Sequence, residues 1–146
     1  MKKILIMAGL LIGLSGCAQQ EVMQQTQSGF AEKTIQDKSQ SVVSQDIINA
    51  CINRGHTIRE SSDSRVVCSS TMQGANAALT QMLIGNSYST TPEVVVSFVI
   101  ASIGENVRVV AQPHVETQMA MGQNQVQSMR DNNALRNNLQ MFLNSL

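Results

Sequence analysis

Residues 93–111 read EVVVSFVIASIGENVRVVA, and this stretch decides the fold. Its first part, residues 93–103, is rich in Val and Ile, a composition typical of a β-strand. A turn at residues 104–106 leads to a second run, residues 107–111, in which apolar side chains recur at alternate positions. The pattern predicts a long antiparallel hairpin. Pro113 restricts the continuation of the second strand to an edge position or a bulge, because proline lacks the N–H that a central strand donates.

The flanking sequence predicts two helices and a second hairpin. Apolar residues at helical spacing predict a first helix over residues 41–54 and a C-terminal helix that is either bent near residues 131–133 or begins there. Between the first helix and the long hairpin, residues 56–60 and 65–70 are expected to pair around a Ser-rich turn. Residues 71–91 mix loop-like and helical features, and we expect a short helical insertion there.

These elements predict an α+β fold over residues 41–146. We expect a four-stranded antiparallel sheet with an N-terminal and a C-terminal helix packed on one face, and the short helical insertion between the two hairpins. The chain has no Trp and few aromatic residues, so Val, Ile, Leu and Met must build the core.

The N-terminus has the organisation of an export signal. Lys2 and Lys3 precede an apolar run over residues 4–13, which is too short to span a bilayer of roughly 30 Å. The run ends at Leu14-Ser15-Gly16-Cys17, which resembles the lipobox of bacterial lipoproteins. The resemblance implies a signal peptide over residues 1–16, a diacylglycerol on the Cys17 thiol, cleavage before Cys17 and acylation of the new amino group. The alternative is an ordinary secretory signal with an incidental Cys.

The residues after the lipobox bear on location. Position 18 is Ala rather than the Asp that retains enterobacterial lipoproteins in the inner membrane, so the resemblance implies lipid anchoring in the outer membrane, with the domain facing the periplasm. Residues 17–40 are rich in Gln and Ser and predict a flexible tether. As a coil this tether would reach roughly 25 to 30 Å.

Apart from Cys17, the chain has two cysteines, Cys51 on the inward face of the first helix and Cys68 on the inward face of a strand. Exported proteins enter an oxidising compartment, so we predict a Cys51–Cys68 disulfide. The alternative is a pair of buried free thiols. A redox-active pair is not expected, because the CxxC spacing is missing.

The sequence offers no recognisable catalytic or cofactor motif. His56 and His114 lie far apart without a carboxylate cluster, so neither a metal site nor any other cofactor is expected. The carboxylates are dispersed near strand ends, and no GxSxG elbow accompanies the many Ser residues. Loss of Lys2 and Lys3 with the signal leaves eight Lys and Arg against ten Asp and Glu. This balance argues against nucleic-acid binding, and we do not expect an enzyme.

The leading hypothesis is therefore a noncatalytic interaction or adaptor domain that is anchored by lipid and contacts another envelope protein. The candidate partner surfaces are an edge strand near residues 113–121 and the C-terminal helix, through Leu139, Phe142 and Leu146. One alternative is a periplasmic carrier with an apolar pocket for a small molecule or lipid. Another is a surface lipoprotein encoded by a mobile element.

Overall fold

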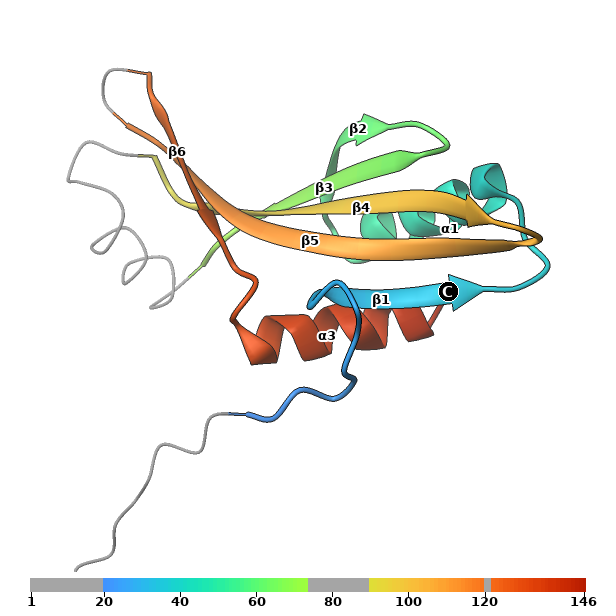
Figure 1. Cartoon of the computed structure of the whole chain (residues 1–146). Coiled ribbons are helices and arrows are strands. Elements are labelled where there is room, and N and C mark those ends of the chain that lie inside the picture. Colours follow the sequence, from blue (N-terminus) through green and yellow to red (C-terminus); the bar gives the residue numbers. More distant parts are fainter. Residues whose placement is uncertain (1–19, 74–89, 120–121) are drawn as a thin grey trace, which may run out of the picture.

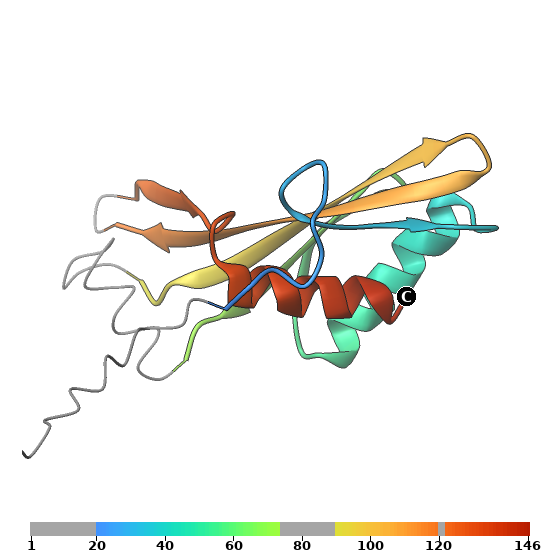
Figure 2. The same ribbon diagram turned by 60° about the horizontal axis from the view of Figure 1, so that its bottom comes forward.

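Six strands pair into one antiparallel sheet in the computed structural model, which describes residues 20–73, 90–119 and 122–146 (Figure 1). The strand order is β1-β5-β4-β3-β2, and β6 also pairs with β5. Both helices lie on the same side of the sheet (Figure 2). The elements are β1 (Ala31–Ile35), α1 (Gln40–Asn53), β2 (Thr57–Ser61), β3 (Arg65–Thr71), β4 (Glu93–Ile103), β5 (Asn106–Gln118), β6 (Asn124–Ser128) and α3 (Asn133–Asn144).

The central hairpin of β4 and β5 follows the predicted limits. The two strands pair from Ile103 opposite Asn106 to Glu93 opposite Glu116. Phe98 lies opposite Ala111, and both side chains are buried on the face that the helices cover. Because side chains alternate along a strand, the residues between them point to the other face. Within the described residues this face carries neither α1 nor α3, and we call it the helix-free face.

β5 is long enough to pair with two different strands on the side opposite β4. Residues 107–111 pair with β1, and residues 114–118 pair with β6. Pro113 lies between the two paired stretches, and its carbonyl accepts a hydrogen bond from the Met129 N–H at 3.1 Å. In an antiparallel strand the N–H and C=O of one residue point to the same side. The missing N–H of Pro113 therefore faces the gap between β1 and β6, as the predicted edge or bulge position requires.

The prediction of a four-stranded sheet is wrong, because β1 and β6 add two strands. β1 lies in the Gln- and Ser-rich stretch that was expected to be tether, and β6 lies in the Asn- and Gln-rich stretch before α3. Each has only five residues, and the sequence of β6, NQVQS, has one apolar residue. Such strands gain their stability from pairing with β5 rather than from their own composition. The predicted helical insertion falls mainly on residues 74–89, outside the described residues.

The first helix confirms the prediction to within a residue at each end, and both of its ends are capped. The Ser39 side chain accepts a hydrogen bond from the Val42 N–H at the start of α1. At the end, the Gly55 N–H donates to the Ile52 carbonyl and the His56 N–H donates to the Cys51 carbonyl. This is a Schellman motif, and Gly55 supplies its left-handed residue with φ +74°. The chain is thereby turned directly into β2.

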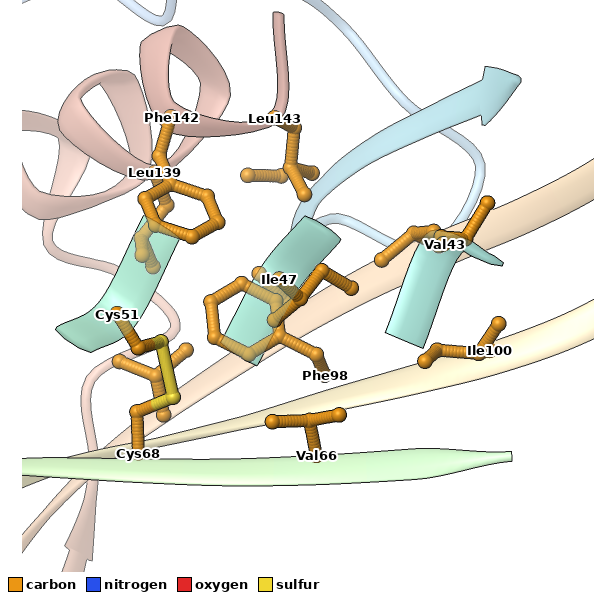
Figure 3. Packing of buried hydrophobic residues seen from close by; sticks show 14 of the residues in the cluster. Val43, Ile47, Cys51, Val66, Cys68, Phe98, Ile100, Leu139, Phe142 and Leu143 are labelled. Carbon is orange, nitrogen blue, oxygen red and sulfur yellow. A yellow bond between two sulfur atoms is a disulfide. The ribbon is translucent and has the colours of Figure 1, made fainter. Parts of the chain in front are cut away.

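The core fills the space between the helices and the sheet (Figure 3). α1 contributes Val43 and Ile47, which pack toward Phe98 in the middle of β4. The rings of Phe98 and Phe142 stack with their centroids 5.1 Å apart, and this contact joins α3 to the sheet. The inward-facing apolar residues of α1 and α3 are thus used for packing, whereas Val42, Ile52 and Met141 are exposed.

We expect Phe142→Ala to lower the free energy of unfolding by about 3 kcal/mol, because it removes a buried ring and leaves a cavity. Met141→Ala is the control, since Met141 is its neighbour on α3 and is 51% exposed. The control should change stability by less than about 0.5 kcal/mol. Urea denaturation followed by circular dichroism measures both, and equal effects would contradict this account of the core.

Candidate functional site

α3 has an apolar face and a polar face, and both are occupied. Leu139 and Phe142, which the sequence analysis named as candidate partner residues, are each only 8% exposed and belong to the core. Leu146, the third candidate, packs against the same cluster and is partly buried. These three residues hold the helix on the sheet and do not form an exposed apolar stripe.

The polar face of α3 binds the backbone of the segment that precedes β1. The Asn137 amide donates to the Glu21 carbonyl at 2.8 Å and accepts from the Met23 N–H at 2.7 Å. One turn further on, the Gln140 amide donates to the Glu32 carbonyl at 3.0 Å and accepts from the Glu32 N–H at 3.2 Å. Each amide satisfies a donor and an acceptor of the main chain, as a neighbouring strand would. Asn137 and Gln140 are themselves buried.

Two further side chains of α3 extend this contact. The Asn133 amide donates to the Gln20 carbonyl at 2.8 Å, and the Arg136 guanidinium donates to the Gln24 carbonyl at 3.0 Å. The four residues are spaced so that they share one stripe of the helix. We refer to this set as the polar clamp: Asn133, Arg136, Asn137 and Gln140. It fixes residues 20–32 along α3, whereas a flexible tether was expected over this stretch.

A tight turn closes the clamped segment onto the sheet. Gly29 has φ +73°, and a Cβ there would lie 2.7 Å from the Arg130 guanidinium, so this position requires glycine. Glu32 accepts from the Ser28 hydroxyl and from the Arg108 guanidinium, the latter at 2.8 Å. Burial acts to raise the pKa of Glu32, but these hydrogen bonds outweigh it and the pKa lies below its ordinary value.

The helix-free face carries a cluster of charged side chains on its own strands. The Arg59 guanidinium forms ion pairs with Glu93 and with Glu116, the latter at 2.5 Å. His114 Nε2 lies 2.9 Å from the other oxygen of Glu116. The cluster consists of one guanidinium, two carboxylates and one imidazole, and its charge is −1 when His114 is neutral.

This cluster was not predicted from the sequence, where the carboxylates were placed near strand ends and His114 had no partner. The signal was present, because His114 and Glu116 are two residues apart in a strand and therefore share a face. The contribution of Arg59 could not be foreseen, since it requires β3 to pair with β4 and the guanidinium to reach across β3 to Glu93 and Glu116.

A polar hollow of about 520 Å³ opens beside the cluster. Its walls come from five strands, β2 to β6, and from the stretch before β4, and include Arg59, Thr71, Thr90, Glu93, Glu116 and Asn124. The only guanidinium in the wall is already paired with two carboxylates, so the hollow has no uncompensated positive charge for an anion. Its chemistry is that of neutral and acidic hydrogen-bonding groups.

We expect ionised Glu116 to stabilise the fold above its ordinary pKa. Burial acts to raise the pKa of Glu116, but hydrogen bonds from Arg59 and His114 outweigh it and hold the pKa below the ordinary value of 4.5. The stabilisation is therefore complete above pH 4.5 and is lost as the pH falls below it. Glu116→Gln should cost up to about 1 kcal/mol at neutral pH, because the pair is partly exposed.

Urea unfolding of the wild type and of Glu116→Gln at a series of pH values tests this. The difference between the two proteins should shrink as the medium is acidified. Glu105→Gln, in the exposed turn between β4 and β5, is the matched control for loss of one carboxylate. A difference for Glu116→Gln that stays constant with pH would contradict the role of the ion pair.

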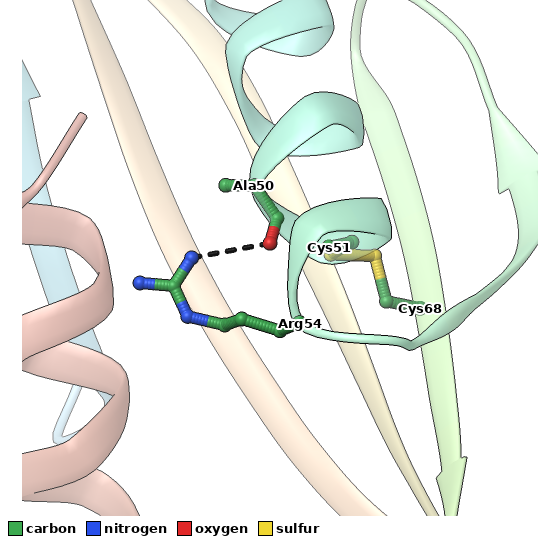
Figure 4. The surroundings of a disulfide bond; sticks show 4 residues. All are labelled: Ala50, Cys51, Arg54 and Cys68. Carbon is green, nitrogen blue, oxygen red and sulfur yellow. Dashed lines mark hydrogen bonds between the residues drawn. A yellow bond between two sulfur atoms is a disulfide. The ribbon is translucent and has the colours of Figure 1, made fainter.

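Cys51 and Cys68 form the predicted disulfide, which joins the last turn of α1 to β3 (Figure 4). Their Cα atoms are 6.5 Å apart and 17 residues separate them in sequence. Beside the bridge, the Arg54 guanidinium donates to the Ala50 carbonyl at 3.1 Å and stands 4.5 Å from the centroid of the Phe142 ring. The end of α1 is thus tied to β3 covalently and to α3 by a cation–π contact.

Removal of the bridge by Cys51→Ala and Cys68→Ala together should lower the free energy of unfolding by about 3 kcal/mol, since a loop of this length is released in the unfolded chain. Chemical denaturation with and without dithiothreitol measures the effect. The reductant should shift the midpoint of the wild type and leave that of the double variant unchanged. A wild-type denaturation midpoint that is the same with and without dithiothreitol would contradict a stabilising disulfide.

The prediction of an edge strand near residues 113–121 is wrong in its described part, because residues 114–116 of β5 pair with β4 on one side and with β6 on the other. The remaining predicted sites are placed as follows. Cys17 lies outside the described residues. His56 caps the end of α1 through its backbone, and burial, with the nearby charge of Arg54, lowers its pKa. Across the described ranges no group of three His, Cys, Asp or Glu side chains is arranged to hold a metal ion. In the same ranges no helix has the length and hydrophobicity needed to cross a membrane.

Comparison with known proteins yields no relative for this chain: no family model matches it, and neither the curated proteins nor the solved structures contain a significant match.

Proposed function

We propose that this chain is a lipid-anchored protein of a bacterial cell envelope, and that its domain acts by binding another envelope protein rather than by catalysis. The observation that carries the proposal is the N-terminal sequence, in which a basic start and an apolar run end at Leu14-Ser15-Gly16-Cys17. Ala18 favours the outer membrane as the site of anchoring, with the domain facing the periplasm.

The disulfide supports export. Disulfides persist in oxidising compartments such as the bacterial periplasm and are rare in the cytosol. Cys51 and Cys68 are buried and bonded to each other, so the fold contains a structural disulfide of the kind that an oxidising compartment maintains. This leaves Cys17 as the cysteine available for lipid.

The edges of the sheet suggest how a partner would bind. The outer side of β1 is occupied, because Gln140 bonds the N–H and C=O of Glu32. β2, at the other edge, has a register shift between Ile58 and Glu60 and carries charged side chains, and both features discourage further pairing. β6 has neither protection: its five residues are uncharged and exposed, and in the described part of the chain its only strand partner is β5. We propose that an extended segment of the partner adds to β6.

The anchor is tested by mass spectrometry of the full chain expressed in bacteria. We expect the mature protein to begin at Cys17 and to carry the mass of a diacylglycerol and an additional acyl chain. Cys17→Ser should abolish the added mass and release the protein from the membrane fraction. An unmodified Cys17 in the exported wild type would contradict the proposal.

The partner surface is tested by crosslinking in living cells followed by mass spectrometry. Val126→Lys places a charge in the middle of β6 and should abolish capture of the partner. Val42→Lys is the matched control, since Val42 is 47% exposed on α1 and Val126 is 58% exposed on β6. Cys17→Ser should weaken capture as well, because the soluble domain is no longer confined to the membrane. Equal capture by wild type and Val126→Lys would remove β6 as the binding edge.

A further inference from the structure

The polar clamp begins almost at the proposed anchor. Its first contact joins Asn133, the first residue of α3, to the carbonyl of Gln20. Gln20 follows Cys17 by three residues in the sequence. Three residues reach at most about 11 Å even when fully extended. The Gln20 backbone, to which the start of α3 is hydrogen-bonded, can therefore lie no more than about 11 Å from the Cys17 backbone.

The short distance between the anchor and the domain results from the polar clamp and not from the composition of residues 17–40. If residues 17–40 were a free coil, the domain would sit roughly 25 to 30 Å from the anchor. Asn137 and Gln140 remove that freedom, since together they hold both ends of the stretch from Glu21 to Glu32 through hydrogen bonds in a buried setting. Breaking one such contact leaves a buried amide without a partner, which is unfavourable because the amide has no water to bond instead. The segment accordingly behaves as part of the domain.

The clamp also fixes which end of the domain faces the anchor. Along α3, the contacts run in order from Asn133 with Gln20 to Lys33 with the carbonyl of Leu143. α3 therefore runs beside β1 in the same direction, and β1 points toward the turn between β4 and β5. Figures 1 and 2 both show that turn at one end of the sheet, whereas the start of α3 lies toward the other end, where the hairpin of β5 and β6 projects beyond it. The five-residue pairing of β1 with β5 alone separates the two ends by about 17 Å.

The end of the domain near the anchor is polar and nearly neutral in charge. Its exposed side chains include Glu21, Arg130, Asp131 and Asn132, which together carry one positive and two negative charges. Among the described residues this end therefore carries only a small charge, so its repulsion of anionic lipid is weak. It suits contact with phospholipid headgroups, to which amides and Arg can donate hydrogen bonds.

We propose that the polar clamp seats the domain close to the membrane, with the end that carries the start of α3 and the β5–β6 hairpin toward the phospholipid headgroups and the turn between β4 and β5 pointing away. This inference rests on the proposed lipid anchor at Cys17. It assigns α3 a role in orientation, since the clamped helix limits both the height and the tilt of the domain.

The experiment places a fluorescent amino acid at Asp131 or at Glu105 in the full chain. The lipidated protein is purified from membranes and reconstituted into vesicles of phosphatidylethanolamine and phosphatidylglycerol that contain a nitroxide-headgroup lipid. We expect at least threefold stronger quenching at position 131 than at position 105. Equal quenching at the two positions would overturn the inference.

Two variants test the cause. A flexible 20-residue Gly/Ser insertion between Gln19 and Gln20 leaves the folded part unchanged and adds a coil of roughly 25 Å, so the difference in quenching should disappear. Asn133→Ala with Asn137→Ala should weaken it, whereas Asn138→Ala, at an exposed amide of the same helix, should not. A difference that survives the insertion would show that the anchor does not set the orientation and would overturn the inference.

Failure of the proposed function is recognised separately. A mass spectrum without lipid on Cys17 removes the anchor and this inference together. Lipid on Cys17 combined with equal quenching at positions 131 and 105 leaves the anchor in place and removes the inference alone.

Discussion

The structure depends on the length of β5. β4 takes one side of this strand along almost its whole extent, and the other side is divided between β1 and β6. A strand of half that length could not hold both β1, which carries the clamped segment, and β6, which leads to α3. The two helices also depend on it, because α1 follows β1 and α3 follows β6, so that both are positioned by strands that pair with the same neighbour.

The elements with a strong local pattern were predictable and those that depend on a partner were not. Alternating apolar residues predict the strands of the long hairpin, and apolar residues at helical spacing predict the first helix. The structure confirms the limits of these elements. Cys51 and Cys68 fall on inward faces by the same reasoning. β1 and β6 are short, polar and stabilised by β5, so their own residues carry too little signal.

In the candidate site, too, some contacts follow from the local sequence pattern and others depend on the order of the strands. The pairing of His114 with Glu116 follows from strand periodicity alone, but the contribution of Arg59 requires the sheet order. The apolar face of α3 was read correctly as apolar and assigned to a partner, whereas the sheet itself covers it. The amides of α3 illustrate a more general point. Asn and Gln are usually taken as marks of disorder, yet here Asn137 and Gln140 are buried and complete the hydrogen bonding of a neighbouring chain segment.

The short span of the disulfide has a consequence for the order in which the protein matures. Cys51 and Cys68 enclose only the end of α1, β2 and half of β3, so the thiols can meet without help from the C-terminal half of the chain. If the chain is exported N-terminus first, as proposed, both thiols reach the oxidising side before β4, β5 and β6. The bridge can then join α1 to β3 before β5, the strand that pairs with both β1 and β4, has been delivered. The segment before β1 must wait longer still, because its hydrogen-bonding partner α3 is the last element of the chain.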